Sequence, residues 1–249
     1  ISECLVGSEM CIRDRYSAGI DRLTHQPLSF SVSETTEGVH IHIIDAELMG
    51  KGEKEKKDLY IEGVQNNGII NHYEYIINSE GTIEIRHVLK PEGKMPLWFP
   101  RIGLTLTVSD ALDQVKWYGR GPQENYPDRK TGYPMGIYAS TVQAMYEPYL
   151  MPQDYGLRTD VRWLQLTTDK GIGLQFKMNE WFNFNIYPYS TDNLTKAMYT
   201  YQLQKQKGMT LNLDYATTGV GCTARGVFGA YKAMPQEYRR TISIRPMMK

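Results

Sequence analysis

The feature that most constrains this chain is a period-two alternation of apolar and polar residues, which recurs from about residue 28 onward. In "LSFSVSE" (28–34) and "GVHIHIIDAEL" (38–48), apolar side chains alternate with polar ones. "HYEYIINSEGTIEIRHVLKP" (72–91) shows the same alternation on both sides of a polar turn, as a β-hairpin would. Because successive side chains of a strand point to opposite faces, this period predicts strands, whereas helices repeat every 3.6 residues.

Further alternating segments extend this prediction to the whole chain. They follow one another at about 8–15 residues, a spacing typical of an antiparallel sandwich. Only residues 190–203 suggest a helix, with Thr191 or Asp192 as its N-cap. No linker or repeat divides the chain, so we expect one all-β domain over residues 16–249. The further segments are "RIGLTLTV" (101–108), "VRWLQLTT" (161–168), "GIGLQFKM" (171–178), "WFNFNIYPY" (181–189), "MTLNLDYA" (209–216) and "YRRTISIRP" (238–246).

Residues 1–15, "ISECLVGSEMCIRDR", differ in character from everything that follows. The string resembles translated sequencing-adapter sequence, and we interpret it as non-native rather than as an ordinary short helix. It contains Cys4 and Cys11, which with Cys222 make an odd, scattered set without a C-x-x-C pair. Such a set predicts neither a zinc site nor a disulfide framework.

The charge composition narrows the classes of partner. Twenty-eight basic and twenty-eight acidic residues give a formal net charge of zero, whereas nucleic-acid and anionic-membrane partners normally select a basic excess. The mixed-charge segment "KGEKEKKDLY" (51–60) is expected to be a solvated loop. No apolar run approaches the roughly 18 residues of a membrane-spanning helix. We therefore expect a soluble protein without nucleic-acid or membrane partners. The sequence leaves the compartment open between a bacterial-type cytoplasm and a periplasm.

No complete catalytic apparatus is recognisable in these residues. The chain lacks a G-x-S-x-G elbow, a Walker loop and an H-E-x-x-H motif. His40 and His42 share one face of a predicted strand, but this is its polar face, where solvent-exposed histidine is common; no metal site is assigned. Cys222 has no activating histidine in its half of the chain, so we expect a buried structural thiol.

A different signal comes from "WYGRGPQENYPDRKTGYPMGIY" (117–138), which mixes aromatic, Gly, Pro and charged residues. Neither a helix nor a plain strand would use this mixture, so we expect a series of tight turns. Glycosidase chemistry needs two carboxylates, and spacing alone nominates no pair; Glu124 and Asp128 flank Tyr126, but Arg120 and Arg129 beside them favour the ionised forms. A general acid instead needs a raised pKa. The better interpretation is a structural ion-pair loop made of these four residues.

This stretch and four later blocks, in the same order, resemble the C-terminal domain of family 2 glycoside hydrolases of the β-galactosidase type, also called the small-chain domain. The resemblance covers about residues 16–246 and implies an antiparallel supersandwich like that of galactose mutarotases. The later blocks are "YEPYLMPQDYGLRTDVRWLQL" (146–166), "FNFNIYPYS" (182–190), "LNLDYATTGVG" (211–221) and "YRRTISIRP" (238–246).

The resemblance also implies a division of labour within a longer enzyme. The intact protein would hydrolyse terminal β-galactosides with retention, through two Glu residues of a TIM barrel that no part of this chain resembles. The chain would then be an N-terminally truncated fragment with no catalytic residue and no cofactor of its own. Its partners would be the β-galactoside and the barrel of the same protein, which in the family often holds a divalent metal such as Mg²⁺ or Ca²⁺.

One block departs from the family pattern. Where well-known members place a Trp that closes one side of the sugar site, this chain has Gly226, within "GVGCTARG" (219–226). A platform for a sugar face is therefore missing at this position. The residues nominated for the rim of the substrate site are Gly221, Cys222, Arg225, whose guanidinium could donate to hydroxyls, and Tyr126.

Two alternatives to the β-galactosidase interpretation remain. A free-standing carbohydrate-binding module would need a complete domain with an exposed aromatic platform. An aldose epimerase of the same fold would need a histidine acid at the sugar, and no histidine follows residue 87.

Overall fold

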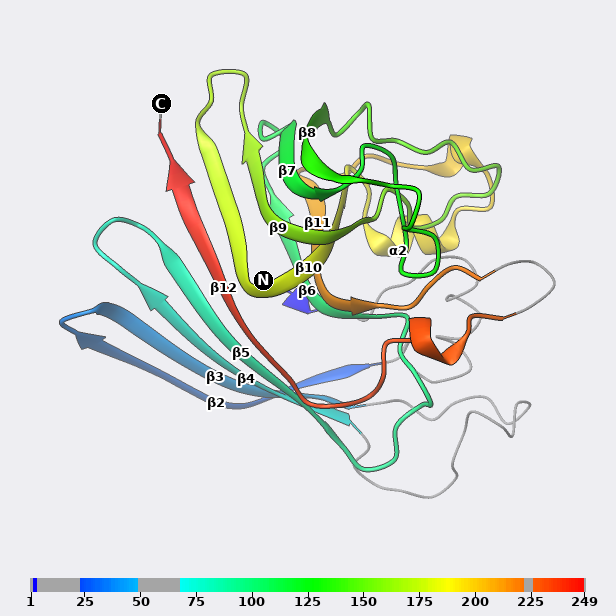
Figure 1. Ribbon diagram of the computed structural model, residues 1–249. Coiled ribbons are helices and arrows are strands. Elements are labelled where there is room, and N and C mark those ends of the chain that lie inside the picture. The colour runs from blue at the N-terminus through cyan, green and yellow to red at the C-terminus, as the bar shows by residue number, and fades with distance from the viewer. Residues whose placement is uncertain (1, 4–22, 49–67, 222–225, 249) are drawn as a thin grey trace.

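The computed structural model describes residues 2–3, 23–48, 68–221 and 226–248, which form mostly antiparallel β-structure (Figure 1). The charged segment 51–60 and, apart from residues 2–3, the segment 1–15 lie outside the described residues. None of the helices in the described part is long and apolar enough to span a bilayer. The strands are β1 (Ser2–Glu3), β2 (Thr24–Thr35), β3 (Gly38–Leu48), β4 (Gly68–Ile77), β5 (Ile83–Glu92), β6 (Arg101–Val108), β7 (Gln114–Arg120), β8 (Met135–Thr141), β9 (Arg158–Thr167), β10 (Gly173–Tyr187), β11 (Met209–Thr217) and β12 (Tyr238–Met247). The helices are α2 (Thr191–Lys196) and the 3₁₀ turns η2 (Thr200–Gln202) and η3 (Gly229–Tyr231).

All strand pairings are antiparallel and join the strands into one network, which confirms the predicted all-β supersandwich. The main path runs β1-β6-β11-β10-β12-β5-β4-β3-β2, and β9, β7 and β8 continue from the other side of β10. Figure 1 shows β2 to β5 and β12 fanning out on one side of β10, with β7 to β9 on the other. Strand β10 therefore connects the two parts of the sandwich.

This connecting strand is longer than the sequence predicted. Two separate segments, 171–178 and 181–189, were expected, but β10 is a single strand of 15 residues. Its first part, residues 173–178, pairs with β12, and its last part, residues 183–187, pairs with β11. The register against β9 shifts between Lys177 and Phe182, which accommodates the intervening residues 178–181 without ending the strand.

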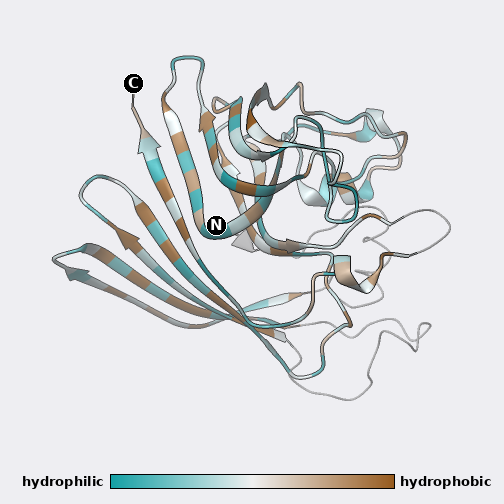
Figure 2. Ribbon diagram, viewed as in Figure 1, coloured by the Kyte–Doolittle hydropathy of each residue, from teal (hydrophilic) through white to brown (hydrophobic). Residues whose placement is uncertain are grey.

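The apolar faces of the strands meet in one large core. Trp117, Phe176 and Phe184 are essentially inaccessible to solvent, and the Trp117 ring meets Phe184 edge-on with 5.9 Å between ring centroids. Figure 2 shows the alternating hydrophobic and hydrophilic bands along β3, β4 and β5 that produce this one-sided burial. The prediction that alternation marks inward-facing positions holds at Tyr73 and Ile85, whereas the polar residues Asp45, Glu47 and His87 are also buried.

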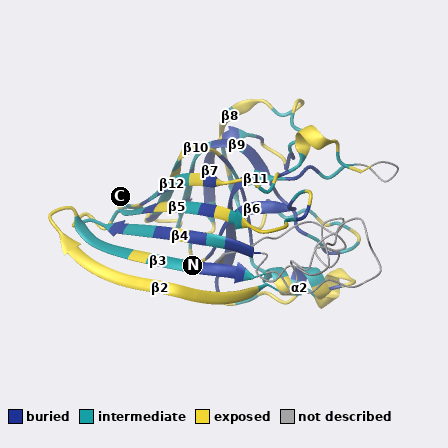
Figure 3. Cartoon of the chain, turned by 90° about the horizontal axis from the view of Figure 1, so that it is seen from below, coloured by how far each residue is buried: buried dark blue, intermediate teal, exposed yellow. Residues whose placement is uncertain are grey.

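Strand β2 is an exception. Leu28, Phe30 and Val32 alternate as expected, yet they are 50%, 69% and 56% exposed. β2 is the last strand of the path and, among the described strands, pairs only with β3 (Figure 3). In the part of the chain that the structure describes, nothing covers its apolar face.

A second exception concerns the positions of β10 and β11 that the alternation places on a polar outer face. Asn185, Asn212 and Asp214 are buried, because this face is also covered. Tyr155 and Leu194 pack there against Tyr187 in a second, smaller hydrophobic cluster. The sheet is thus buried on both sides at this place.

The buried polar residues beneath this cover interact with one another. Arg101 Nη2 lies 2.8 Å from Asp214 Oδ2, and its Nη1 lies 3.5 Å from Asp154 Oδ1. Asn185 donates to Asp154 over 2.7 Å and accepts from Asn212 over 2.8 Å. Burial raises the pKa of Asp214 to about 7, against the opposing effect of Arg101 and with a further rise from Asp154.

The predicted helix near residue 190 is confirmed as the short helix α2, but its cap is a different residue. Ser190 is the N-cap, and its Oγ accepts a hydrogen bond of 3.0 Å from the backbone N–H of Asn193. Thr191 and Asp192, which were expected to cap it, are the first two helical residues. The hydroxyl one position earlier reaches the free N–H of the first turn, as an N-cap does.

Candidate functional site

The stretch 117–138 forms the tip of a hairpin. Its two ends are strands, since β7 and β8 pair Trp117 with Tyr138, so the prediction that no plain strand would use this sequence is wrong there. The alternation of buried Val115, Trp117 and Gly119 with exposed neighbours explains the strand. The indole Nε1 of Trp117 donates to the carbonyl of Arg120 over 3.0 Å. The buried indole thereby anchors the start of the loop at residues 121–134.

Glu124 is the polar centre of this loop. Its buried carboxylate accepts from the backbone N–H of Gly156 over 2.8 Å and from the Tyr126 hydroxyl over 3.3 Å. The Tyr149 hydroxyl and the Arg129 guanidinium also donate to it. Burial and the hydrogen bond to Glu124 raise the pKa of Tyr149 to about 12, so this hydroxyl remains a donor at neutral pH. The carboxylate is held from several directions and has a structural role.

Tyr126 belongs to the same cluster. Its ring is 3% exposed and lies 4.8 Å below the guanidinium of Arg129. This burial leaves no ring face on which a sugar could stack, so the structure does not support the nomination of Tyr126 for the substrate rim. The sequence could not indicate this, because an aromatic residue between turns suits packing and sugar contact equally well.

Asp128 joins the hairpin loop to a second loop that is distant in sequence. Its Oδ1 and Oδ2 accept from the backbone N–H groups of Val220 and Gly221 over 3.1 Å and 2.7 Å. Gly219 lies directly against the carboxylate, since an added Cβ would stand 2.4 Å from Asp128 Cγ. Gly221 has a φ of +65°, a conformation that favours glycine. We call this junction of Asp128 with residues 219–221 the loop clasp.

Arg120 makes a different pair from the one predicted. It lies neither with Glu124 nor with Asp128; its Nε donates to Asp160 Oδ2 over 2.5 Å, and Lys130 Nζ reaches Asp160 Oδ1 over 2.8 Å. Burial alone would raise the pKa of Asp160, but the hydrogen bonds from Lys130 and Arg120 outweigh it and hold the pKa below its ordinary value. Of the four residues of the predicted ion-pair loop, only Glu124 and Arg129 pair with each other.

Sequence reasoning missed Asp160, although its environment is distinctive. It is the only non-glycine residue with positive φ, at +56°, among the residues described. Asp and Asn adopt this conformation more readily than other non-glycine residues. Asp160 lies in the "RTDVRW" block, which carries part of the family resemblance. The block did not indicate which side chains contact Asp160.

The nominated rim residues divide into two groups. Gly221 lies in the loop clasp, whereas Cys222 and Arg225 lie outside the described residues, which resume at Gly226. The structure therefore brings one nominated residue, Gly221, against one residue of the predicted ion-pair loop, Asp128. The two family blocks at 117–138 and 211–221 meet at this point.

Replacing Gly219 by Ala is expected to open the loop clasp. The new Cβ would overlap the Asp128 carboxylate, which itself is held by two backbone N–H groups. Overpacking of this kind costs about 1–3 kcal/mol of the free energy of unfolding. Urea unfolding of the variant tests this, with Gly132→Ala as the matched control because a Cβ there meets nothing within 4 Å. Equal stability of the two variants would contradict the packing described.

Comparisons with known proteins place the chain in a family. The profile described as "Beta galactosidase small chain" matches residues 18–244. A beta-galactosidase from Priestia megaterium is 38% identical over 147 residues, which cover 59% of this chain and 14% of that protein. A beta-galactosidase from Vibrio cholerae is 31% identical over 207 residues, which cover 83% of this chain and 18% of that protein. Among solved structures, a galactose 1-epimerase from Lactobacillus acidophilus aligns with a TM-score of 0.44 at 10% identity, over 90% of this chain and 66% of that one.

The matched regions of these two relatives amount to less than a fifth of their length. The family profile, in contrast, extends over nearly the whole chain and includes both loops of the clasp. The chain therefore belongs to the beta-galactosidase small-chain family.

Proposed function

We propose that this chain is a non-catalytic domain of a longer β-galactosidase, in which the loop clasp shapes one side of the sugar site. The observation that carries the proposal is the contact of Asp128 with Val220 and Gly221. It joins two segments that are 92–93 residues apart in sequence, and both belong to the blocks that resemble the family. A rigid junction between them would fix residues 219–221 relative to the hairpin loop.

The hydrogen bonds or the burial of four acidic side chains support a non-catalytic role for this domain. A retaining glycosidase needs two carboxyl groups about 5–5.5 Å apart, on either side of the scissile bond. In the described part of the chain, Glu124, Asp128 and Asp160 are engaged by the donors given above. Asp214 has the raised pKa of a general acid, but it is fully buried against Arg101, where no sugar could reach it. None of these four carboxylates is therefore assigned to bond breaking, and the proposal gives that role to another part of the protein.

The remaining features of the intact enzyme follow from this assignment. Its substrate would be a terminal β-galactoside, and the partner of this domain would be the catalytic TIM barrel of the same protein. A divalent metal such as Mg²⁺ or Ca²⁺ would be bound by barrel residues. Such ions prefer oxygen ligands and have no part in the loop clasp, where Asp128 is occupied by backbone N–H groups.

The purified chain is expected to release no nitrophenol from a nitrophenyl β-galactoside. Circular dichroism and a cooperative thermal transition would first establish that the chain is folded. Turnover by the folded chain, lost neither on dilution nor on further purification, would contradict the proposal.

The alternative of a free-standing carbohydrate-binding module is not favoured, because the relatives that match the chain are β-galactosidases. The buried position of Tyr126 also removes one aromatic platform that such a module could use. Isothermal titration of the same folded chain with galactose and lactose distinguishes the two. Saturable binding by the chain alone would favour the module.

A further inference from the structure

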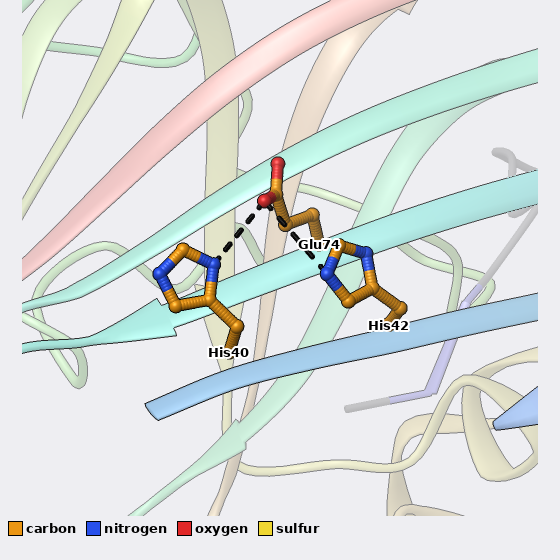
Figure 4. Close-up of side chains that lie close together, drawn as sticks. All are labelled: His40, His42 and Glu74. Carbon is orange, nitrogen blue, oxygen red and sulfur yellow. Dashed lines mark hydrogen bonds and ion pairs between the residues drawn. The ribbon is translucent and has the colours of Figure 1, made fainter. Parts of the chain in front are cut away.

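Three side chains with metal-binding atoms gather on the sheet formed by β3 and β4, away from the loop clasp. His40 and His42 alternate along β3 and so share one face, and the pairing of the strands places Glu74 directly opposite His42. One ligand atom from each lies within 4.8 Å of the others (Figure 4). Glu74 Oε1 stands between the rings, 3.3 Å from His40 Nδ1 and 3.9 Å from His42 Nε2.

We propose that His40, His42 and Glu74 form a binding site for a borderline divalent transition-metal ion, of which Zn²⁺ is the representative. Two imidazoles and one carboxylate, with an open fourth position, are a ligand set that Zn²⁺ uses in proteins. Mg²⁺ and Ca²⁺ select oxygen ligands instead, so this site would not take the ions expected in the barrel. The proposal does not depend on the β-galactosidase assignment.

The distances approach those around such an ion, and the ligand atoms, which lie within 4.8 Å of one another, must draw closer to hold it. Zn–N and Zn–O bonds of about 2.0–2.1 Å at tetrahedral angles place neighbouring ligand atoms roughly 3.3–3.4 Å apart. The His40–Glu74 separation of 3.3 Å already has this value, and the His42–Glu74 separation of 3.9 Å needs to shorten by about half an ångström. His42, with 48% of its side chain exposed, has room to move, whereas His40 is only 12% exposed and is held in place. Exposure on the His42 side leaves the fourth position open to water.

Neighbouring groups orient two of the ligands. Arg86 Nη1 donates to Glu74 Oε2 over 3.1 Å, which leaves Oε1 directed toward the imidazoles, and Glu84 holds Arg86 Nε over 2.8 Å. The Nε2 atom of His40 is buried without a hydrogen-bond partner among the described residues and lies 3.9 Å from Glu37 Oε2. Metal-bound histidines usually direct their other ring nitrogen to such a carboxylate. A metal on Nδ1 would leave Nε2 protonated and able to donate to Glu37.

The charge of the surroundings also favours a cation. Three carboxylates, Glu37, Glu74 and Glu84, stand around the two histidines, whose imidazoles would be neutral as metal ligands, against the single guanidinium of Arg86. The sum is three negative charges and one positive charge, so a divalent ion would neutralise the cluster. The ion would also link β3 to β4 beside the exposed strand β2.

Isothermal titration of the folded chain with ZnCl₂ is expected to show this site, and its loss in His42→Ala and Glu74→Gln. Removing a ligand should weaken binding by more than the about 10–100-fold typical of a changed outer partner. MgCl₂ and CaCl₂ should give no saturable heat. With free Zn²⁺ at about 100 times its Kd, the folded-to-unfolded ratio of the wild type should rise about a hundredfold, and the two variants should lose this gain.

The matched control is His25→Ala, which removes a half-exposed histidine on β2 outside the cluster. Co²⁺ provides an independent readout, because the visible absorption of a bound ion reports its coordination geometry. His42→Gln serves as a second variant, since an exposed polar replacement at this position should leave the fold intact. No Zn²⁺ binding by the wild type, or binding that persists unchanged in both His42→Ala and Glu74→Gln, would overturn the proposal.

Discussion

Replacing Arg101 by Met should lower the free energy of unfolding by about 3–5 kcal/mol, because it removes one partner of a buried charge network. Arg101 is fully buried and lies between Asp214 and Asp154. Without the guanidinium, these carboxylates would be left in a low-dielectric environment with only neutral donors. Urea unfolding at pH 8, above the pKa of about 7 of Asp214, is the suitable measurement because this carboxyl is then ionised in the wild type.

Two further variants separate this effect from general damage. Arg239→Met breaks the exposed pair with Glu237 and should cost no more than about 1 kcal/mol. The double variant Arg101→Met with Asp214→Leu should recover part of the loss, because it removes one of the two carboxylates left without the guanidinium. If Arg101→Met cost no more than Arg239→Met, the network would not stabilise the sandwich as described.

Lowering the pH from 6.5 to 3 should reduce the contribution of His87 to the free energy of unfolding by about 4–5 kcal/mol. His87 is buried, with Nδ1 2.7 Å from the Tyr215 hydroxyl and Nε2 3.2 Å from Asn71 Oδ1. Burial, with a smaller effect of His72, lowers its pKa from 6.5 to about 3. Between these values only the unfolded state takes up the proton, so the loss grows as the pH falls and is absent above about pH 6.5.

The comparison with His87→Gln isolates this effect. Asp214 acts in the opposite direction, since its raised pKa lets the folded state take up a proton between about pH 7 and pH 3.8. The wild-type profile alone therefore contains both effects. The difference between wild type and His87→Gln should change by about 1.4 kcal/mol per pH unit when unfolding is measured at pH 5.5 and 4.5. A difference that does not vary with pH would show that His87 is not held neutral.

The alternation of the sequence predicted the central strands because it reports which side chains share a face. It could not predict what covers that face. Asn212 and Asp214 alternate with leucines just as exposed residues do, yet they are buried on the face that the cluster of Tyr155, Tyr187 and Leu194 covers. Phe30 shows the converse, an inward-type residue on a strand that no described segment covers.

The sequence motifs predicted which segments form the candidate site, but not which of their residues contact one another. The motif blocks nominated both Asp128 and Gly221, but a contact between residues 93 apart depends on the arrangement of the whole sandwich. The His40–His42–Glu74 cluster was missed for a related reason. The sequence placed the two histidines on one face, but only the register of β3 against β4 brings Glu74 to them.

The central claim is that the loop clasp shapes the sugar site of a longer enzyme whose catalytic groups lie elsewhere. Its most direct test is kcat/KM for a nitrophenyl β-galactoside, measured on the full-length protein carrying Asp128→Asn. Weakening the two hydrogen bonds to Val220 and Gly221 should displace the loop and lower kcat/KM by about 10- to 100-fold. The exposed Asp192→Asn in α2 should leave it unchanged. An Asp128→Asn enzyme with the same thermal stability and the same kcat/KM as the wild type would contradict the claim.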